Sequence, residues 1–382
     1  MGKLAKDTFF LIGLSILLSA AVSCGRQQAE WKGTIEDVNG VELIKNPREP
    51  MYGERIYVLE EDLSIGKASD RQEHAFSEII DVGADNEENI YVLDFKQSHV
   101  RVFDKVGGYL RTIGKMGQGP GEIQRPTSLY ITPGNELLVN DRGARFLHFF
   151  ALGGAYLRSR SLARWTSFSR PKVDAHDNIV VRIPIFAPEK VTFVLKKFDA
   201  GLNELFQIFS YEMDNTPGIY DVHPPQCFWD LGRDDCIVWG YSDKYELHVL
   251  NPGGQVARRI IKDYEPVLTT EEEKKEWIES AFGEKGVPPD VKVNWPKYHN
   301  AFQSLRADDE GRIIIQTYEK TPDASGSYCD VFDRQGKFIV KIPVKSEPRV
   351  WKKERFYTIE ENEDGYQCVK RYRITWLKRP DA

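Results

Sequence analysis

The sequence predicts an all-β protein built from a repeated four-stranded antiparallel unit. Short apolar runs alternate along the chain with turns rich in Asp, Asn and Gly, a pattern typical of strands joined by tight reversals. The same order of strands and turns recurs five times between residues 77 and 342. With 382 residues, 41% of them hydrophobic and 12% aromatic, the chain can bury a sizeable core.

The first residues are predicted to be a targeting segment. Two lysines give a basic start, and the apolar run over 9–22 is too short to span a bilayer but has the length of a signal-peptide core. The run ends in AVSC at 21–24, which resembles the lipobox of bacterial lipoproteins. We therefore expect a lipoprotein signal peptide over 1–23, a lipid on Cys24 and a tether over 24–34. The alternative is a secretory signal with an incidental cysteine.

Charge and cysteine content exclude several classes of protein. A net charge of −6 offers no basic surface for nucleic acid. The four cysteines after Cys24 lack the paired spacing of a zinc site and are too few for a disulfide scaffold. We expect them to be buried free thiols. A turn at 232–235 would leave Cys227 and Cys236 out of register, which disfavours a disulfide between them.

The repeated unit is clearest over 77–113. Its four predicted strands are EIIDVGA, IYVLD, HVRVFD and YLRTI, and the alternation in VRVF has the period of two expected of a strand with one more buried face. The four later copies begin at Thr127, Arg170, Gln226 and Ala301. Every copy places an acidic or amide turn before its second strand and a Gly or Asp/Asn turn before its fourth.

Both ends of the chain carry further strand-like segments. The tail offers about three strands of a sixth unit, and the head offers strands that belong to no unit. A β-propeller closes its ring by pairing an N-terminal strand with an incomplete last blade, which hides both sheet edges. We therefore predict a six-bladed β-propeller of four-stranded antiparallel blades over 35–377, with residues near 57–63 beside those near 366–376 and a tail over 378–382. The alternative, a pair of β-sandwiches, does not require the same unit five times.

A glycine-rich stretch, GKMGQGPGEIQRPTSLYI at 114–131, looks at first like a phosphate-binding loop. A phosphate loop needs a helix after its glycines and usually a Lys-Ser/Thr pair. A strand follows here, so the stretch is predicted to connect two blades, with glycines permitting a tight reversal and Pro120 and Pro126 stiffening it. Because it follows a fourth strand, it should open on the same face as the loops after the second strands.

The motif G-x-x-G-x-G-P-G-E-I-x-x-P, running into a strand, an acidic turn and an I-Y-V-x-D strand, resembles the NHL-type repeat. The match is carried by Gly114, Gly117, Gly119, Pro120, Gly121, Glu122, Ile123 and Pro126. Over roughly 30–377 the chain resembles the six-bladed β-propeller lipoproteins common in gut Bacteroidetes. The resemblance implies the fold and an envelope location, and little chemistry.

Residues 264–299 form an insertion after the fourth strand of the fourth copy. Thr270 and Glu273 make a capping box and Gly283 follows the apolar pattern, so TEEEKKEWIESAFG is predicted to be a short helix. We expect this helix to be a cap packed on the propeller; the alternative is a lid over the central mouth.

Propellers bind ligands where loops of several blades meet at the axis, so residues at second-strand ends are candidates. These are Asp94, Lys96, Asp141, Arg142, Arg145, Arg182, Tyr241, Asp243, Lys244 and Tyr318. The connecting loops add Gln118, Glu122, Gln124, Arg125, His223, Trp295, Tyr298 and His299. The alternative role of each is a solvated rim residue or a turn hydrogen bond. Arg142, Arg145 and Arg182 together suggest a basic mouth for an anionic or carbohydrate ligand.

These patterns favour a lipid-anchored envelope protein that binds a small molecule, a glycan or a protein, without nucleic acid, metal or cofactor, and as a monomer. The alternative is a metal-dependent hydrolase or lyase of the lactonase type using the same mouth, with Ca²⁺ held by oxygen ligands. Residues available for that ion are Asp94, Asn140, Asp141, Asp243 and Glu319. His99, His148 and His248 lie in matching third strands, away from the axis, which disfavours a zinc cage.

Overall fold

The computed structural model of the chain describes residues 30–53, 56–66, 72–165 and 167–378. The expected signal peptide and the lipidated Cys24 lie outside the described residues. From Trp31 onward the chain forms one compact unit. Among the described residues no helix is both long and apolar enough to cross a membrane.

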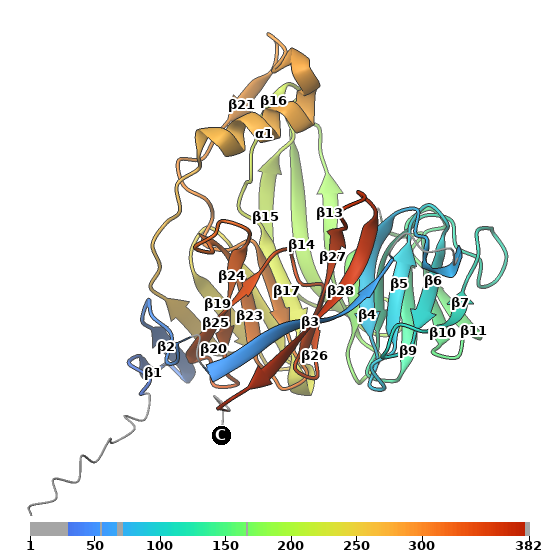
Figure 1. The fold of residues 1–382 in the computed structure, drawn as a ribbon, viewed down its shortest axis with the longest axis horizontal. Coiled ribbons are helices and arrows are strands. Elements are labelled where there is room, and N and C mark those ends of the chain that lie inside the picture. The colour runs from blue at the N-terminus through green and yellow to red at the C-terminus, as the bar shows by residue number, and fades with distance from the viewer. Residues whose placement is uncertain (1–29, 54–55, 67–71, 166, 379–382) are drawn as a thin grey trace, which may run out of the picture. The chain divides into compact units, whose positions relative to one another are not determined.

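Six antiparallel sheets form the blades of a propeller, as predicted (Figure 1). Blade one contains β4 (Ile79–Ala84), β5 (Ile90–Asp94), β6 (His99–Phe103) and β7 (Tyr109–Ile113). Blade two contains β8 (Pro126–Ile131), β9 (Glu136–Asp141), β10 (Phe146–Ala151) and β11 (Tyr156–Ser161). Blade three contains β12 (Ser169–Val173), β13 (Ile179–Phe186), β14 (Lys190–Phe198) and β15 (Glu204–Asp214).

The remaining blades take strands from both ends of the chain. Blade four contains β17 (Cys227–Leu231), β18 (Ile237–Tyr241), β19 (Glu246–Leu250) and β20 (Val256–Lys262), extended by β2 (Val41–Asn46) and β1 (Thr34–Val38). Blade five contains β22 (Ser304–Ala307), β23 (Ile313–Lys320), β24 (Ser327–Phe332) and β25 (Phe338–Val344). Blade six contains β26 (Val350–Lys352), β27 (Arg355–Glu361), β28 (Gln367–Trp376) and β3 (Tyr57–Ile65).

The first strands of the blades surround the axis. β4 lies beside β8, β8 beside β12, β17 beside β22, β22 beside β26 and β26 beside β4. The hydrophobic core lies between neighbouring sheets: Leu93 and Val102 of blade one pack in one cluster with Leu137 and Phe150 of blade two. Burial between sheets leaves the inner edges of the first strands free to line a central channel.

The acidic turns of the repeat have a common hydrogen-bond pattern. Oδ1 of Asp85, between the first two strands of blade one, accepts from the backbone N–H groups of Glu87 and Asn89 at 2.8 and 2.9 Å. Asp174 and Asp308 do the same at the matching positions of blades three and five. Short carboxylate side chains satisfy turn amides in this way, which explains why the repeat is visible in the sequence.

An N-terminal strand closes the ring, and this prediction is confirmed. β3 pairs antiparallel with β28, so that Tyr57 lies opposite Trp376 and Ile65 opposite Val369. Arg371 adds a two-pronged ion pair to Asp62, with its Nε 2.7 Å and its Nη2 3.2 Å from the carboxylate oxygens.

The N-terminal segment also covers blades four and five, which the sequence did not reveal. β2 pairs parallel with β20 on the outer edge of blade four. The N–H groups of Met51 and Tyr52 donate to the carbonyls of Phe338 and Ile339 in blade five at 3.0 and 2.9 Å. Residues 34–65 therefore tie together the outer edges of three consecutive blades.

Asn46 is the side chain that joins this segment to two blades. It is 3% exposed, and its Oδ1 accepts from Phe338 N at 2.7 Å and from Trp31 Nε1 at 2.9 Å. Its Nδ2 donates to the carbonyl oxygens of Gly336 at 2.9 Å and Ile261 at 3.3 Å. A buried amide that both donates and accepts in this way leaves no polar group of the junction unpaired.

The glycine-rich stretch is a folded connection between blades one and two, as predicted. Gly114 and Gly121 have φ of 74° and 76°, in the region that favours glycine. The carboxylate of Glu122 accepts from Gly119 N at 2.8 Å and lies so close to Gly117 that a Cβ there would clash with it. Ile123 is fully buried in the core between the two blades.

Replacing Asn46 by alanine should lower the free energy of unfolding by about 2–4 kcal/mol, because buried backbone groups of blades four and five lose their partners. Chemical denaturation measures this directly. Asn215→Ala removes an exposed amide and is the matched control, with a change expected to be near zero. Equal effects of the two variants would contradict the role given to Asn46.

Asp141 should make part of the stability acid-sensitive. Burial by itself would raise the pKa of this carboxyl, but His148 and the surrounding backbone N–H groups lower it from 3.8 to about 2. A depressed pKa stabilises the folded state above the unfolded-state value, and this contribution, about 2 kcal/mol, disappears as the pH falls from about 4 to about 2. Asp141→Asn should therefore have a lower free energy of unfolding than the wild type at neutral pH. The difference between the two proteins should decrease as the pH falls through this range. Asp243→Asn, which removes an exposed carboxylate on the loop after β18, is the surface control and should leave the stability nearly unchanged at neutral pH.

Candidate functional site

A cavity of about 520 Å³ runs along the axis and is lined mainly by the first strands of all six blades. One end is lined by residues at the starts of these strands, including Ser169, Gln226 and Gln303. This end opens on the face that carries the loops after the second and fourth strands. The other end is lined by first-to-second-strand turns and carries Asp308 and Asp309.

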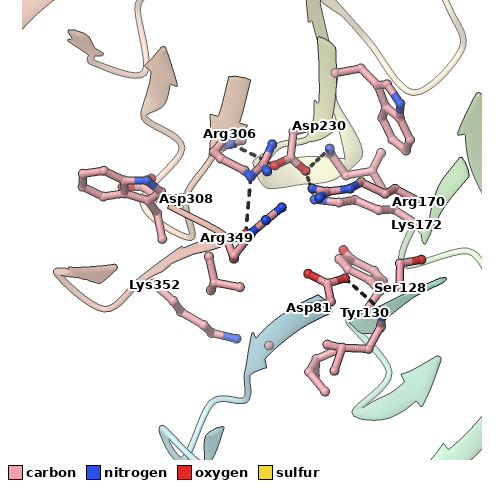
Figure 2. Close-up of a pocket in the computed structure, with 18 of the residues that line it drawn as sticks. Asp81, Ser128, Tyr130, Arg170, Lys172, Asp230, Arg306, Asp308, Arg349 and Lys352 are labelled. Carbon is pink, nitrogen blue, oxygen red and sulfur yellow. Dashed lines mark hydrogen bonds and ion pairs between the residues drawn. The ribbon is translucent and has the colours of Figure 1, made fainter. Parts of the chain in front are cut away.

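A cluster of basic side chains gathers inside the channel, from residues before and within the first strands. Figure 2 shows Arg170 and Lys172 of blade three facing Arg306 of blade five and Arg349, next to blade six, around Asp230 of blade four. We call these five residues, together with Arg182 and Glu347, the axial cluster. It contains five cationic side chains and two carboxylates, so its net charge is positive.

Asp230 holds the axial cluster together. Its carboxylate is buried and forms an ion pair with Lys172 Nζ through Oδ1. Its Oδ2 accepts from the backbone N–H of Ala307 at 3.1 Å. One carboxylate therefore connects blades three, four and five at the axis. Asp81 has the same arrangement between blades one and two, accepting from Leu129 N at 3.0 Å.

Glu347 pairs with the arginines on the other side of the cluster. Arg306 Nη2 is 2.6 Å from Glu347 Oε1, and Arg349 Nη1 is 3.3 Å from Oε2. Burial alone would raise the pKa of Glu347, but Arg306, Arg349 and Arg170 more than offset it and the pKa is lowered. Burial lowers the pKa of both Lys172 and Arg306, and Arg170 acts in the same direction.

Arg170 is the cation of the cluster that points into the cavity without a hydrogen-bond partner among the described residues. It is exposed, and it follows Ser169 at a break in the register between β12 and β13. Its φ is 49°, a left-handed conformation that costs a residue with a side chain about 1–2 kcal/mol. Backbone strain of this kind is concentrated at binding sites, where it positions a side chain.

The structure brings two of the ten second-strand candidates to a cavity. Arg182 lines the axial channel, where its Nη1 donates to Tyr211 Oη at 3.1 Å and to the carbonyl of Cys227 at 3.3 Å. Tyr318 lines a second cavity, described below, and stacks on His299 with ring centroids 4.2 Å apart. Burial and then Glu273 raise the pKa of Tyr318 to about 12.

The other eight second-strand candidates, which include Asp141 and Tyr241, line neither cavity. Asp94 is fully buried and accepts backbone N–H groups of Ser77, Glu78 and Gln97, and Asp243 is exposed. Lys96 and Lys244 are exposed and pair with Glu78 at 3.6 Å and Glu246 at 2.8 Å. Arg142 is exposed, and exposed Arg145 donates to the carbonyls of Ala163 and Trp165. Arg142 and Arg145 therefore do not join Arg182 in a basic mouth.

Most of the axial cluster is absent from the candidates chosen from sequence. The channel is lined by first strands, whereas the candidates were taken from second-strand ends, which lie further from the axis. The usable signal is a charged residue inside a short first strand, as in Lys172, Asp230 and Arg306.

The residues considered for a metal ion are dispersed. Asn140 Nδ2 donates to Thr127 and to the carbonyl of Phe168, and Glu319 pairs with Lys341. Within the described part of the chain one cluster has metal-ligand spacing: Asp174, His176 and Asp235. It lies on first-to-second-strand turns outside the channel lining, and Asp174 already pairs with Lys197 at 2.8 Å.

The insertion forms the predicted helix. α1 (Glu271–Phe282) has Thr270 as its N-cap, a complete capping box with Glu273 and Gly283 at its C-cap with φ of 68°. Figure 1 places it with the parallel pair β16 (Ile219–Asp221) and β21 (Lys292–Asn294), beyond the long strands of blade three. None of its residues is fully buried, so it is not packed on the blades as a closely fitted cap.

A second cavity, of about 610 Å³, lies between α1 and blade five. Glu273, Trp277 and Trp295 line it from the insertion, and Gln316 and Tyr318 line it from blade five. Gln303 and Glu347 line both this cavity and the axial channel, so the two adjoin on one face. Of the loop candidates, His223, Trp295 and His299 lie here.

Comparisons with known proteins agree with the propeller fold. Residues 71–214 match the family model described as "6-bladed beta-propeller" (DUF5128). The chain resembles the crystal structure of a Bacteroides fragilis protein described as a "putative exported protein", with 13% identity, a TM-score of 0.56 and coverage of 87% of this chain and 99% of that one. It also resembles a member of the DUF4221 family from Bacteroides vulgatus, with 11% identity, a TM-score of 0.50 and coverage of 84% and 99%. No curated protein matches the sequence.

The chain is thus a six-bladed β-propeller with an open axial channel. It is similar in fold to propeller proteins of Bacteroides, as the glycine-rich repeat had indicated.

Proposed function

We propose that the protein is a lipid-anchored propeller of the bacterial outer membrane, on its periplasmic or surface side, that binds a small anionic ligand in its axial channel. The observation that carries this proposal is the axial cluster, in which five cations converge from several blades on two carboxylates. The whole channel lining keeps a positive balance, with seven Lys and Arg residues against five Asp and Glu residues. Guanidinium groups hold carboxylates, phosphates or sulfates through paired hydrogen bonds.

The cluster is suited to binding because its members are already held in place. Asp230 fixes Lys172, and Glu347 fixes Arg306 and Arg349, before any ligand arrives. Arg170 has no such partner among the described residues and offers its donors to the cavity. A volume of about 520 Å³ is in the ordinary range for small-molecule sites, roughly 300–1,000 Å³.

The envelope location rests on the N-terminal sequence and on the fold similarity to a protein described as exported. Lipidation of Cys24 would place the propeller at a membrane surface. A stoichiometric divalent ion at the axis of the purified protein would instead support a hydrolase or lyase.

Arg170→Gln should weaken the binding of a small anion at least tenfold, because it removes the unpaired guanidinium of the cavity. Isothermal titration of the mature protein with citrate, phosphate, sulfate and a hexuronic acid identifies the anion and measures the loss. Affinity should also fall as salt is added, since partly exposed charges are screened.

Arg142→Gln is the matched control, because it removes an exposed arginine on the outside of the channel. Its affinity should equal that of the wild type. Loss of binding in both variants, or in neither, would contradict a specific site at the axial cluster.

Replacing Cys24 by alanine should abolish lipid attachment and release the protein from membranes. Incorporation of labelled palmitate, followed by membrane fractionation of bacteria that express each form, measures both effects. Cys236→Ala, which removes a half-buried free thiol of blade four, should keep the label. Membrane association that persists without Cys24 would contradict the anchor.

A further inference from the structure

The side of α1 that faces the propeller lines the second cavity and does not pack against the blades. Glu273, Glu276, Trp277 and Ser280 line the second cavity, and their spacing of three, four and seven residues places them on one side of the helix. A helix that only packs presents an apolar stripe to its neighbour. Here the stripe is replaced by two carboxylates, an indole and a hydroxyl.

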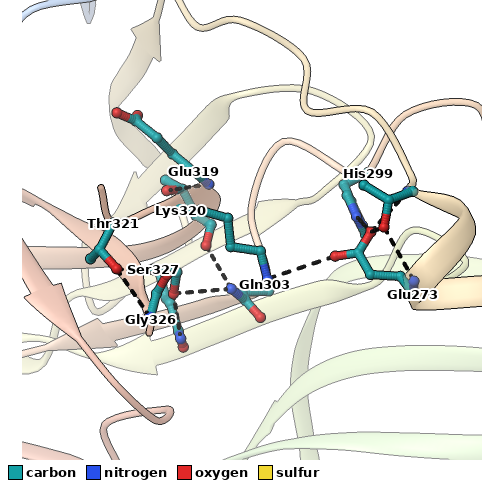
Figure 3. Close-up of polar contacts among 11 residues, drawn as sticks. Glu273, His299, Gln303, Glu319, Lys320, Thr321, Gly326 and Ser327 are labelled. Atoms are coloured by element: carbon teal, nitrogen blue, oxygen red, sulfur yellow. Dashed lines mark hydrogen bonds and ion pairs between the residues drawn. The ribbon is translucent and has the colours of Figure 1, made fainter. Parts of the chain in front are cut away.

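Polar contacts hold this surface in place over blade five. Figure 3 shows Glu273 between the helix, His299 and Lys320. Its Oε2 is 3.1 Å from His299 Nε2, and its Oε1 is 3.7 Å from Lys320 Nζ. The same carboxylate closes the capping box with Thr270 N at 3.0 Å. The wall of the cavity is therefore fixed before a ligand binds.

Two tryptophans give the cavity its apolar surface. The rings of Trp277 and Trp295 meet edge to face, with centroids 5.4 Å apart. Both rings are half-buried, and neither indole N–H has an acceptor among the described residues. A half-buried indole with an unpaired N–H suits a ligand that has both an apolar ring face and hydroxyl groups.

The polar groups of the cavity are mainly hydroxyl, amide and carboxylate groups. They include Ser280, Gln303, Gln316, Ser325 and Ser327. Two lysines, Lys320 and Lys345, stand against three glutamates, so the cavity lacks the positive charge of the axial cluster. It is therefore matched to an uncharged, hydroxyl-rich group and not to a second anion.

The two cavities adjoin at Gln303 and Glu347, so one ligand can occupy both. We propose that they form a single extended site for an acidic oligosaccharide, with the anionic sugar at the axial cluster and a neighbouring sugar ring against Trp277 and Trp295. This assignment rests on the proposed anion-binding function and adds the class of ligand. An acidic peptide fits less well, because the second cavity is lined mainly by side-chain hydroxyl, amide and indole groups.

Titration calorimetry of the mature protein tests the assignment with five probes. These are a hexuronic acid, its trisaccharide, a sulfated hexose, its trisaccharide and a triglutamate peptide. One acidic trisaccharide should bind the wild type at least tenfold more tightly than its own monosaccharide. Comparing the affinities for the uronic and the sulfated sugars shows whether the arginines prefer a carboxylate or a sulfate. Arg170→Gln should weaken both the trisaccharide and the monosaccharide.

Two variants of α1 isolate the second cavity. Trp277→Ala removes the indole, and Ser280→Trp fills the cavity from an exposed helix position. Each variant should lower the affinity for the trisaccharide to that for the monosaccharide. The affinity for the monosaccharide should stay as in the wild type. Tyr298→Ala, an exposed aromatic of the same insertion outside the cavity, is the control and should change neither affinity.

The outcomes separate this inference from the proposed function. A monosaccharide that binds while its trisaccharide binds no more tightly overturns the extended site and leaves anion binding in place. If triglutamate binds more tightly than the sugars, and Trp277→Ala removes this difference in affinity, the ligand is a peptide and the assignment to a saccharide is wrong. Failure of every acidic probe to bind overturns the proposed function and the inference together.

Discussion

The structure depends on ring closure by the N-terminal segment. Six sheets can surround an axis only if the first and last are joined, and β3 makes this join by pairing with residues 369–376 of β28. An unpaired edge at this position would expose backbone donors and acceptors to water and to other chains. The segment does more than close the ring, because β2 and residues 51–52 also cover the outer edges of blades four and five. Asn46 anchors it where those two blades meet.

Closure has a direct electrostatic consequence at the axis. It brings first strands that are far apart in the chain to within hydrogen-bond distance, and charged residues within those strands then meet. Asp230 pairs with Lys172 from the preceding blade and accepts from Ala307 in the following one. Without this carboxylate, Lys172 and Arg306 would repel each other in a partly buried space. The surplus of positive charge that remains is the physical basis for anion binding.

The insertion adds a second cavity that adjoins the axial channel. A helix capped by Thr270 and Glu273 stands over blade five, and the capping glutamate also contacts His299 and Lys320. One side chain thus sets where the helix begins and how its inner face is placed. The result is an aromatic-lined cavity without a surplus of positive charge beside a basic channel, and this difference in charge can orient a ligand.

The sequence determined the features that are local. Asp85 and its counterparts satisfy turn amides within four residues, Thr270 and Glu273 cap a helix three residues apart, and Gly114 and Gly121 allow positive φ. These contacts depend on neighbours in the chain, so the blades and the helix could be predicted. The closing strand pairs with a distant segment and could be predicted because the repeat leaves the sixth unit one strand short. The tertiary structure alone decided which residues line the axis. Arg170, Lys172, Arg306 and Arg349 come from three blades, and only the radial order of strands places first strands, and not second-strand ends, at the centre.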